Sequence, residues 1–103
     1  MSFQRYEDDY AEIASELKKC FKQVGTPSLT ADEVEDCVER ADGLLSELCE
    51  VKQSMQIGVG EVPAGVERAG CERRLREYQA DIDAMTKDLQ RARYEPAVHH
   101  MPL

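Results

Sequence analysis

Residues 3–24 read FQRYEDDYAEIASELKKCFKQV, and the spacing of their apolar side chains predicts a helix. Apolar or aromatic residues recur at steps of three and four, which places them on one face of an α-helix, as in a coiled coil. The residues of this apolar seam are Phe3, Tyr6, Tyr10, Ile13, Leu17, Cys20 and Val24. Gly25 and Pro27 follow, so we expect this helix to end near residue 24.

A second helix is predicted over residues 31–57, opened by a capping box. Thr30 and Glu33 have the spacing at which each side chain satisfies a backbone N–H of the other residue. The apolar seam that follows again has steps of three and four and consists of Val34, Cys37, Ala41, Leu44, Leu48, Val51 and Met55. Val38 and Leu45 widen this apolar stripe, so the helix is expected to touch two neighbours.

A third helix is predicted over residues 64–93. Gly58 and Gly60 weaken the second helix, and Pro63 marks a new start. The seam of the third helix is Cys71, Leu75, Tyr78, Ile82, Met85, Leu89 and Ala92. Residues 95–103 lack the pattern and are expected to form a flexible tail.

Three long helices joined by short connections predict an all-α fold in residues 1–94. Short links make consecutive helices antiparallel, so we expect an up-down-up three-helix bundle with left-handed, coiled-coil-like packing. The expected core comprises Tyr6, Tyr10, Ile13, Leu17, Val34, Cys37, Ala41, Leu44, Leu48, Val51, Leu75, Tyr78, Ile82, Met85 and Leu89.

The charge of the chain argues against several classes of partner. The net charge is −8, and all of the excess acid lies in the first 50 residues. Such a chain is poorly attracted to nucleic acid, and no nucleic-acid partner is expected. No apolar run approaches the ~20 residues that span a bilayer, so no membrane span is expected within these residues.

The cysteines and histidines do not predict an enzyme or a metal site. Cys20, Cys37 and Cys71 fall on the seams and are expected to be buried, with Cys49 beside a seam. The two histidines, at positions 99 and 100, have no further ligand nearby. We therefore expect no catalytic residue, no metal and no cofactor.

A basic cluster and two apolar residues are the candidate partner-binding positions. Arg73, Arg74 and Arg76 either form a solvated face paired with neighbouring glutamates or contact an acidic protein. Val38 and Leu45 are additional apolar positions beside a seam. These five residues are the predicted partner-binding set.

Several of these features together resemble a known family. The aromatic and acidic start at residues 3–10, the Pro27 linker, the link at 55–63 and the third-helix stretches 74–78 and 88–93 are similar to the N-terminal, Habc-like domain of Qb-type vesicle SNAREs. That family is named for vesicle transport through interaction with t-SNAREs. The resemblance covers nearly all of residues 1–94.

The resemblance implies a non-catalytic regulatory or docking domain of a protein that acts in vesicle traffic and membrane fusion. Its expected partners are SNARE helices and trafficking adaptors, including ENTH-type domains. The expected location is the cytoplasmic face of Golgi, endosomal and lysosomal or vacuolar membranes, with the domain itself cytosolic and monomeric and the parent protein anchored at its C-terminus. The alternative is a generic three-helix scaffold or coiled-coil oligomerisation module, although spectrin-like repeats usually carry tryptophans and this chain has none.

Overall fold

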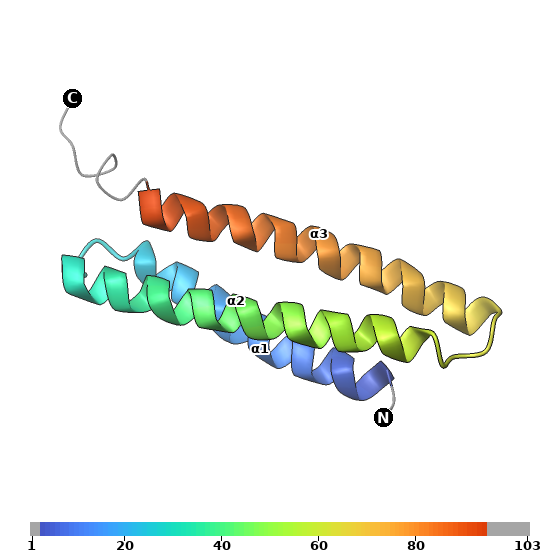
Figure 1. The fold of residues 1–103 in the computed structure, drawn as a ribbon. Coiled ribbons are helices and arrows are strands. Elements are labelled where there is room, and N and C mark those ends of the chain that lie inside the picture. Colours follow the sequence, from blue (N-terminus) through green and yellow to red (C-terminus); the bar gives the residue numbers. More distant parts are fainter. Residues whose placement is uncertain (1–2, 95–103) are drawn as a thin grey trace.

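Three helices make up the part of the chain that the computed structural model describes, residues 3–94. They are α1 (Phe3–Val24), α2 (Ala31–Val59) and α3 (Val66–Tyr94). Consecutive helices run antiparallel and form an elongated bundle, so the predicted all-α three-helix bundle is confirmed (Figure 1). The tail predicted at 95–103, with its two histidines, lies outside the described residues.

The start of α2 shows the predicted capping box. The Thr30 hydroxyl accepts a hydrogen bond from the Glu33 backbone N–H at 3.2 Å, and the Thr30 N–H donates to the Glu33 carboxylate at 3.3 Å. Two N–H groups that have no partner within the helix are thereby satisfied. The entry of the chain into α2 is therefore set by local sequence.

The connection between α2 and α3 lies two residues later in the chain than the sequence predicts. The second helix continues past residue 57 to Val59, whose side chain is only 5% exposed. Burying this side chain offsets the helix-weakening effect of Gly58, where a Cβ would lie 3.8 Å from the Tyr6 ring. The third helix begins at Val66 rather than 64, because Gly65 has φ +147°, which L side chains rarely adopt.

The core lies along all three helices, and α2 is its centre, since it packs extensively on both α1 and α3. Seven of the expected core residues are buried: Tyr10, Leu17, Ala41, Leu48, Ile82, Met85 and Leu89. Seven more are half-buried and pack against them: Tyr6, Ile13, Val34, Leu44, Val51, Leu75 and Tyr78. The core also includes Phe3, Ala14, Cys20, Val38, Leu45, Met55, Val59 and Cys71.

Cys37 differs from the expectation of a core residue. It is half-exposed, and its thiol lies 3.5 Å from the side-chain oxygen of Gln23. The reason is the rotation of α2 about its axis. Val38 and Leu45 face the core and are buried, whereas Cys37 and Leu44, the residues that precede them, lie at the edge of the buried face. A helix held between two neighbours buries the middle of a wide apolar stripe, and its edges stay half-exposed.

Candidate docking surface

The three arginines of the basic cluster on α3, Arg73, Arg74 and Arg76, do not share one environment. Arg74 is drawn inward: its Nε lies 3.0 Å from the Glu7 carboxylate as an ion pair, without hydrogen-bond alignment. Its guanidinium carbon also lies 5.3 Å from the centre of the Phe3 ring, a cation–π distance. Arg73 and Arg76 are exposed. The cluster is thus not one continuous patch, and Arg74 holds α3 to α1.

Two tyrosines strengthen the same contact between α1 and α3. The Tyr78 hydroxyl donates to the Glu7 carboxylate, and the Tyr10 hydroxyl donates to Asp81 Oδ2 at 3.1 Å and lies 3.2 Å from the Tyr78 carbonyl oxygen. Burial, followed by the hydrogen bond to Glu7, raises the pKa of Tyr78 to about 12. Burial and Asp81 raise the pKa of Tyr10 in the same way. These side chains fill the space between α1 and α3 and are not free to bind a partner.

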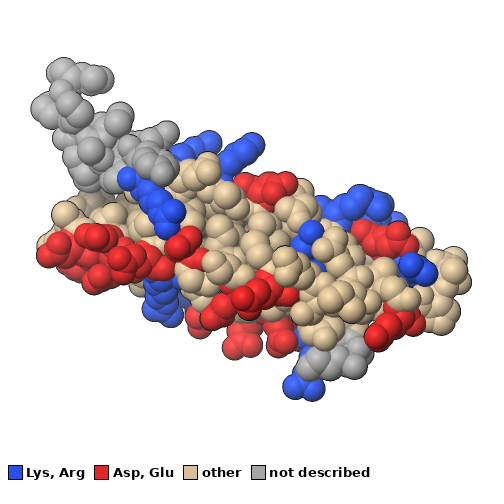
Figure 2. Space-filling view, viewed as in Figure 1, with Lys and Arg blue, Asp and Glu red and all other residues tan. Residues whose placement is uncertain are grey.

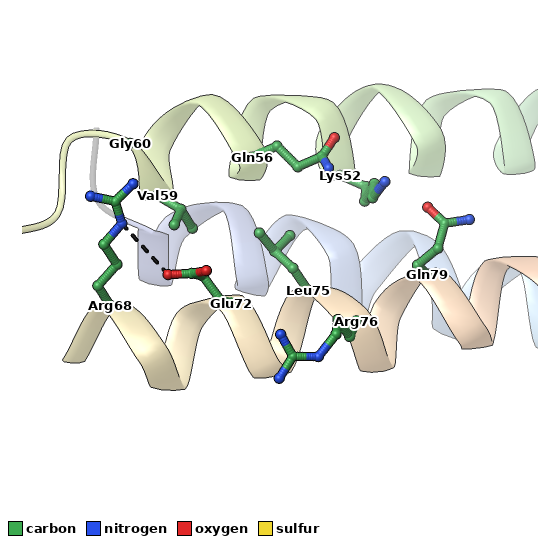
Figure 3. A pocket seen from close by; sticks show the side chains of 9 residues that line it. All are labelled: Lys52, Gln56, Val59, Gly60, Arg68, Glu72, Leu75, Arg76 and Gln79. Atoms are coloured by element: carbon green, nitrogen blue, oxygen red, sulfur yellow. Dashed lines mark ion pairs between the residues drawn. The ribbon is translucent and has the colours of Figure 1, made fainter. Parts of the chain in front are cut away.

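An open groove of about 430 Å³ lies between the C-terminal half of α2 and the N-terminal half of α3 (Figure 3). Val59 of α2 and Leu75 of α3 point toward one another across it, and α1 lies behind them. Its lining residues are Lys52, Gln56, Val59, Gly60, Arg68, Glu72, Leu75, Arg76 and Gln79. The groove is therefore an apolar floor with polar and charged walls.

The charged residues of the groove are mostly basic. Arg68 pairs with Glu72 at 3.6 Å, whereas Lys52 and Arg76 form no ion pair within residues 3–94. Elsewhere on the molecule, acidic side chains gather over the N-terminal end of α2, while several basic ones lie over α3 (Figure 2). The groove thus carries positive charge in a chain whose net charge is −8.

Val38 and Leu45 do not belong to any exposed surface of the described bundle. Each is 8% exposed and lies in the core. Their position beside the seam reflected contact with a second helix of the same bundle, since α2 is flanked by α1 and α3. The large hydrophobic side chains that are exposed within residues 3–93 are Ile57 at 73% and Val66 at 92%, and neither lines the groove.

A second, more apolar pocket of about 540 Å³ lies at the opposite end of the bundle. It is formed where the α1–α2 connection meets the last turns of α3. Its lining residues are Phe21, Val24, Gly25, Thr26, Pro27, Leu29, Val34, Asp88, Arg91 and Ala92. Asp88 and Arg91 pair with each other at 3.8 Å, which leaves no unpaired charge in its wall.

Sequence reasoning missed most of the groove. Of its lining, only Arg76 was predicted to bind a partner, and Leu75 was assigned to the core. A signal existed in the four-residue spacing of Lys52, Gln56 and Gly60 on one face of α2. Arg68, Glu72 and Arg76 have the same spacing on α3, but nothing in the sequence shows that the two rows face each other.

The described residues offer neither a cluster of metal ligands nor a helix that could span a membrane. Within residues 3–94, no group of three or more His, Cys, Asp or Glu side chains is placed to hold a metal ion. In the same residues, none of the helices combines the length and the apolar character needed to cross a bilayer.

The geometry defines a class of protein: an elongated three-helix bundle with a groove of polar, charged and apolar side chains between two of its helices. The chain belongs to the family described as vesicle transport v-SNARE protein N-terminus, whose family model matches residues 1–93 and so covers nearly the whole bundle. Searches of curated proteins and of solved structures gave no match. The family places the chain in vesicle transport, and domains of this family are in general not enzymes.

Proposed function

We propose that this chain is the non-catalytic docking domain at the N-terminus of a SNARE, and that it regulates or routes its parent protein by binding other proteins. The observation that carries this proposal is the family match over residues 1–93, which coincides with a complete bundle of three helices. The proposed partners are trafficking adaptors, including ENTH-type domains, and SNARE helices. The exposed groove between α2 and α3 supports a docking role because its lining has polar groups left available to a partner.

The proposed setting is the cytoplasmic face of Golgi and endosomal membranes, or of lysosomal or vacuolar ones. It follows from the vesicle-transport family and from the resemblance of residues 3–10 and 55–63 to the Qb-type SNAREs. A fluorescent fusion of the complete parent protein, imaged with organelle markers, tests the location. Uniform staining of the plasma membrane alone would contradict it.

We further propose that the isolated domain is a monomer. Large exposed hydrophobic side chains within residues 3–93 are limited to Ile57 and Val66, which do not form the extensive apolar patch that a stable homodimer needs. Sedimentation velocity over a range of concentrations tests this. A dimer or trimer that persists on dilution would favour the oligomerisation module instead.

The docking role is tested by titrating residues 1–103 with purified ENTH-type adaptor domains and with SNARE-helix peptides in a calorimeter. We expect saturable binding by at least one of them. Flat titrations against all of these partners would overturn the proposal. Urea unfolding of the same sample serves as the control that the domain is folded.

A further inference from the structure

The first turns of α2 extend beyond the end of α3 (Figure 1). Arg93, in the last turn of α3, pairs with Asp42 at 3.2 Å, and Asp42 lies about three turns after the start of α2 at Ala31. Within residues 3–94, these turns of α2 therefore have α1 on one side and no part of α3 on the other. The apolar side chains at this end of the bundle are covered less completely than those in its middle.

These apolar side chains line the pocket of about 540 Å³ between the α1–α2 connection and the last turns of α3. Phe21, Leu29 and Val34 all line it, and each is half-buried. In the middle of the bundle, Leu17 and Leu48 on the same two helices are 0% exposed. The pocket therefore has an open apolar floor, against which a side chain of a ligand can be buried.

Acidic side chains gather at this end of the bundle and restrict the charge of the ligand (Figure 2). Glu35 and Glu39 are exposed, and neither is in an ion pair within residues 3–94. Both lie on the side of α2 that faces α3, because Asp42, seven and three positions further along, meets Arg93 there. The charges in the pocket wall are paired with each other, so the rim is acidic overall.

The acidic rim argues against two other occupants of the pocket. It repels the headgroups of an anionic lipid surface. Residues 95–103 of the same chain contain one acid and neither lysine nor arginine, so their charge does not complement the rim. Charge complementarity favours a basic partner.

We propose that this pocket binds a short basic segment of a partner protein. One bulky aliphatic side chain of the segment lies against Phe21, Leu29 and Val34, and lysines or arginines on either side of it lie beside Glu35 and Glu39. This inference rests on the proposed docking function and assigns to it a surface at the opposite end of the bundle from the α2–α3 groove. Because the rim acids are exposed, the binding weakens as salt is raised.

The test uses three synthetic peptides of about ten residues, which span about 33 Å when extended. The first has a central leucine flanked on both sides by lysines, the second replaces the leucine with alanine, and the third replaces the lysines with glutamates. Each is titrated into the ¹⁵N-labelled chain of 103 residues, observed by NMR. We expect the first peptide to shift the amide signals of Phe21, Leu29 and Val34. The alanine peptide should bind about tenfold more weakly, and the glutamate peptide should leave the signals unchanged.

The charge-reversal variant Glu35→Lys/Glu39→Lys should weaken binding of the first peptide by about fivefold or more, because two attractive contacts become repulsive. The matched control is Glu47→Lys/Glu50→Lys, which makes the same charge change at two exposed glutamates about 16–18 Å further along α2. Circular dichroism checks that both variants fold, and Glu35→Gln/Glu39→Gln replaces the first if it does not. Equal weakening by the control would overturn the inference, since only net charge would then matter.

Three other results would also overturn it. The first is the absence of peptide-induced shifts at the pocket. The second is equal binding of the leucine and alanine peptides, which would reduce the contact to charge alone. The third is a shift of the Phe21 and Val34 signals, without any peptide, in the variant Val98→Ser/Met101→Ser, which would make residues 95–103 of the same chain the occupant.

The calorimetric titrations with adaptor domains separate this inference from the docking function on which it rests. An adaptor that binds while the first peptide does not leaves the docking function standing and removes only the pocket. Peptide binding with flat adaptor titrations does the reverse.

Discussion

The rings of Tyr10 and Tyr78 lie with their centroids 4.3 Å apart and their planes at 35°, which joins α1 to α3. Direct contact between α1 and α3 is otherwise the smallest of the three helix pairs. Around the two rings, Glu7 accepts a hydrogen bond from the Tyr78 hydroxyl, Asp81 accepts one from the Tyr10 hydroxyl, and Arg74 forms an ion pair with Glu7. Long polar and aromatic side chains therefore bridge the two helices.

Removing the Tyr78 hydroxyl should destabilise the bundle. Tyr78→Phe removes the hydrogen bond that the half-buried Glu7 carboxylate accepts from Tyr78, although the ion pair with Arg74 remains. We expect the free energy of unfolding to fall by about 1.5–3 kcal/mol, as for other hydrogen bonds to a charged group. Urea unfolding measured by circular dichroism gives the value. Tyr6→Phe is the control, because the Tyr6 hydroxyl makes no hydrogen bond within residues 3–94, and an equal loss there would argue against this explanation.

The same tyrosines should make the bundle sensitive to alkali. The pKa of Tyr78 in the folded chain is about 12, above its ordinary value of 10.0. The protonated hydroxyl is the form that the fold stabilises, so this contribution is complete below pH 10 and is lost as the pH rises through 12. Urea midpoints measured from pH 8 to 12 should fall above pH 10. The fall should be shallower in Tyr78→Phe, and identical pH profiles for the two proteins would contradict the assignment.

The central helix should be the most sensitive to loss of core volume. Leu48 is 0% exposed, and Leu48→Ala removes methyl groups where α2 packs in the core. We expect a loss of about 2–5 kcal/mol, the range for leucine truncation in cores. The matched control is Ile57→Ala on the same helix, since Ile57 is 73% exposed and its truncation should change stability by less than about 0.5 kcal/mol. Thermal unfolding of the two variants side by side provides the measurement.

Two glycines should respond to alanine in opposite directions. Gly43 lies within α2 with nothing within 4 Å of an added Cβ, so Gly43→Ala should stabilise the chain by about 0.5–1 kcal/mol. Gly65 also has open space but a φ of +147°, so Gly65→Ala should destabilise it by about 1 kcal/mol or more. Urea midpoints report both changes. Stabilisation by both substitutions would show that α3 starts earlier in solution.

The sequence by itself determined the number, order and approximate limits of the helices. Seams such as Phe3 to Val24 and the capping box of Thr30 and Glu33 depend on residues three or four positions apart, whose relative placement a helix sets locally. The family resemblance rests on the same local patterns, and the match over residues 1–93 agrees with it. The limits at Val59 and Gly65 shifted because burial and backbone conformation there depend on the whole chain.

Only the tertiary structure decided which side of each helix meets a neighbour. The sequence offered two roles for Val38 and Leu45, contact of α2 with a second neighbouring helix and binding of a partner protein, and their burial in the core favours the first. Arg74 and Arg76 are two positions apart, yet one pairs with Glu7 on α1 and the other lines the α2–α3 groove. Adjacent positions on a helix point in directions 100° apart. The rotation of each helix about its axis therefore decides which of its side chains are buried and which are exposed. That rotation is determined by packing between distant segments of the chain.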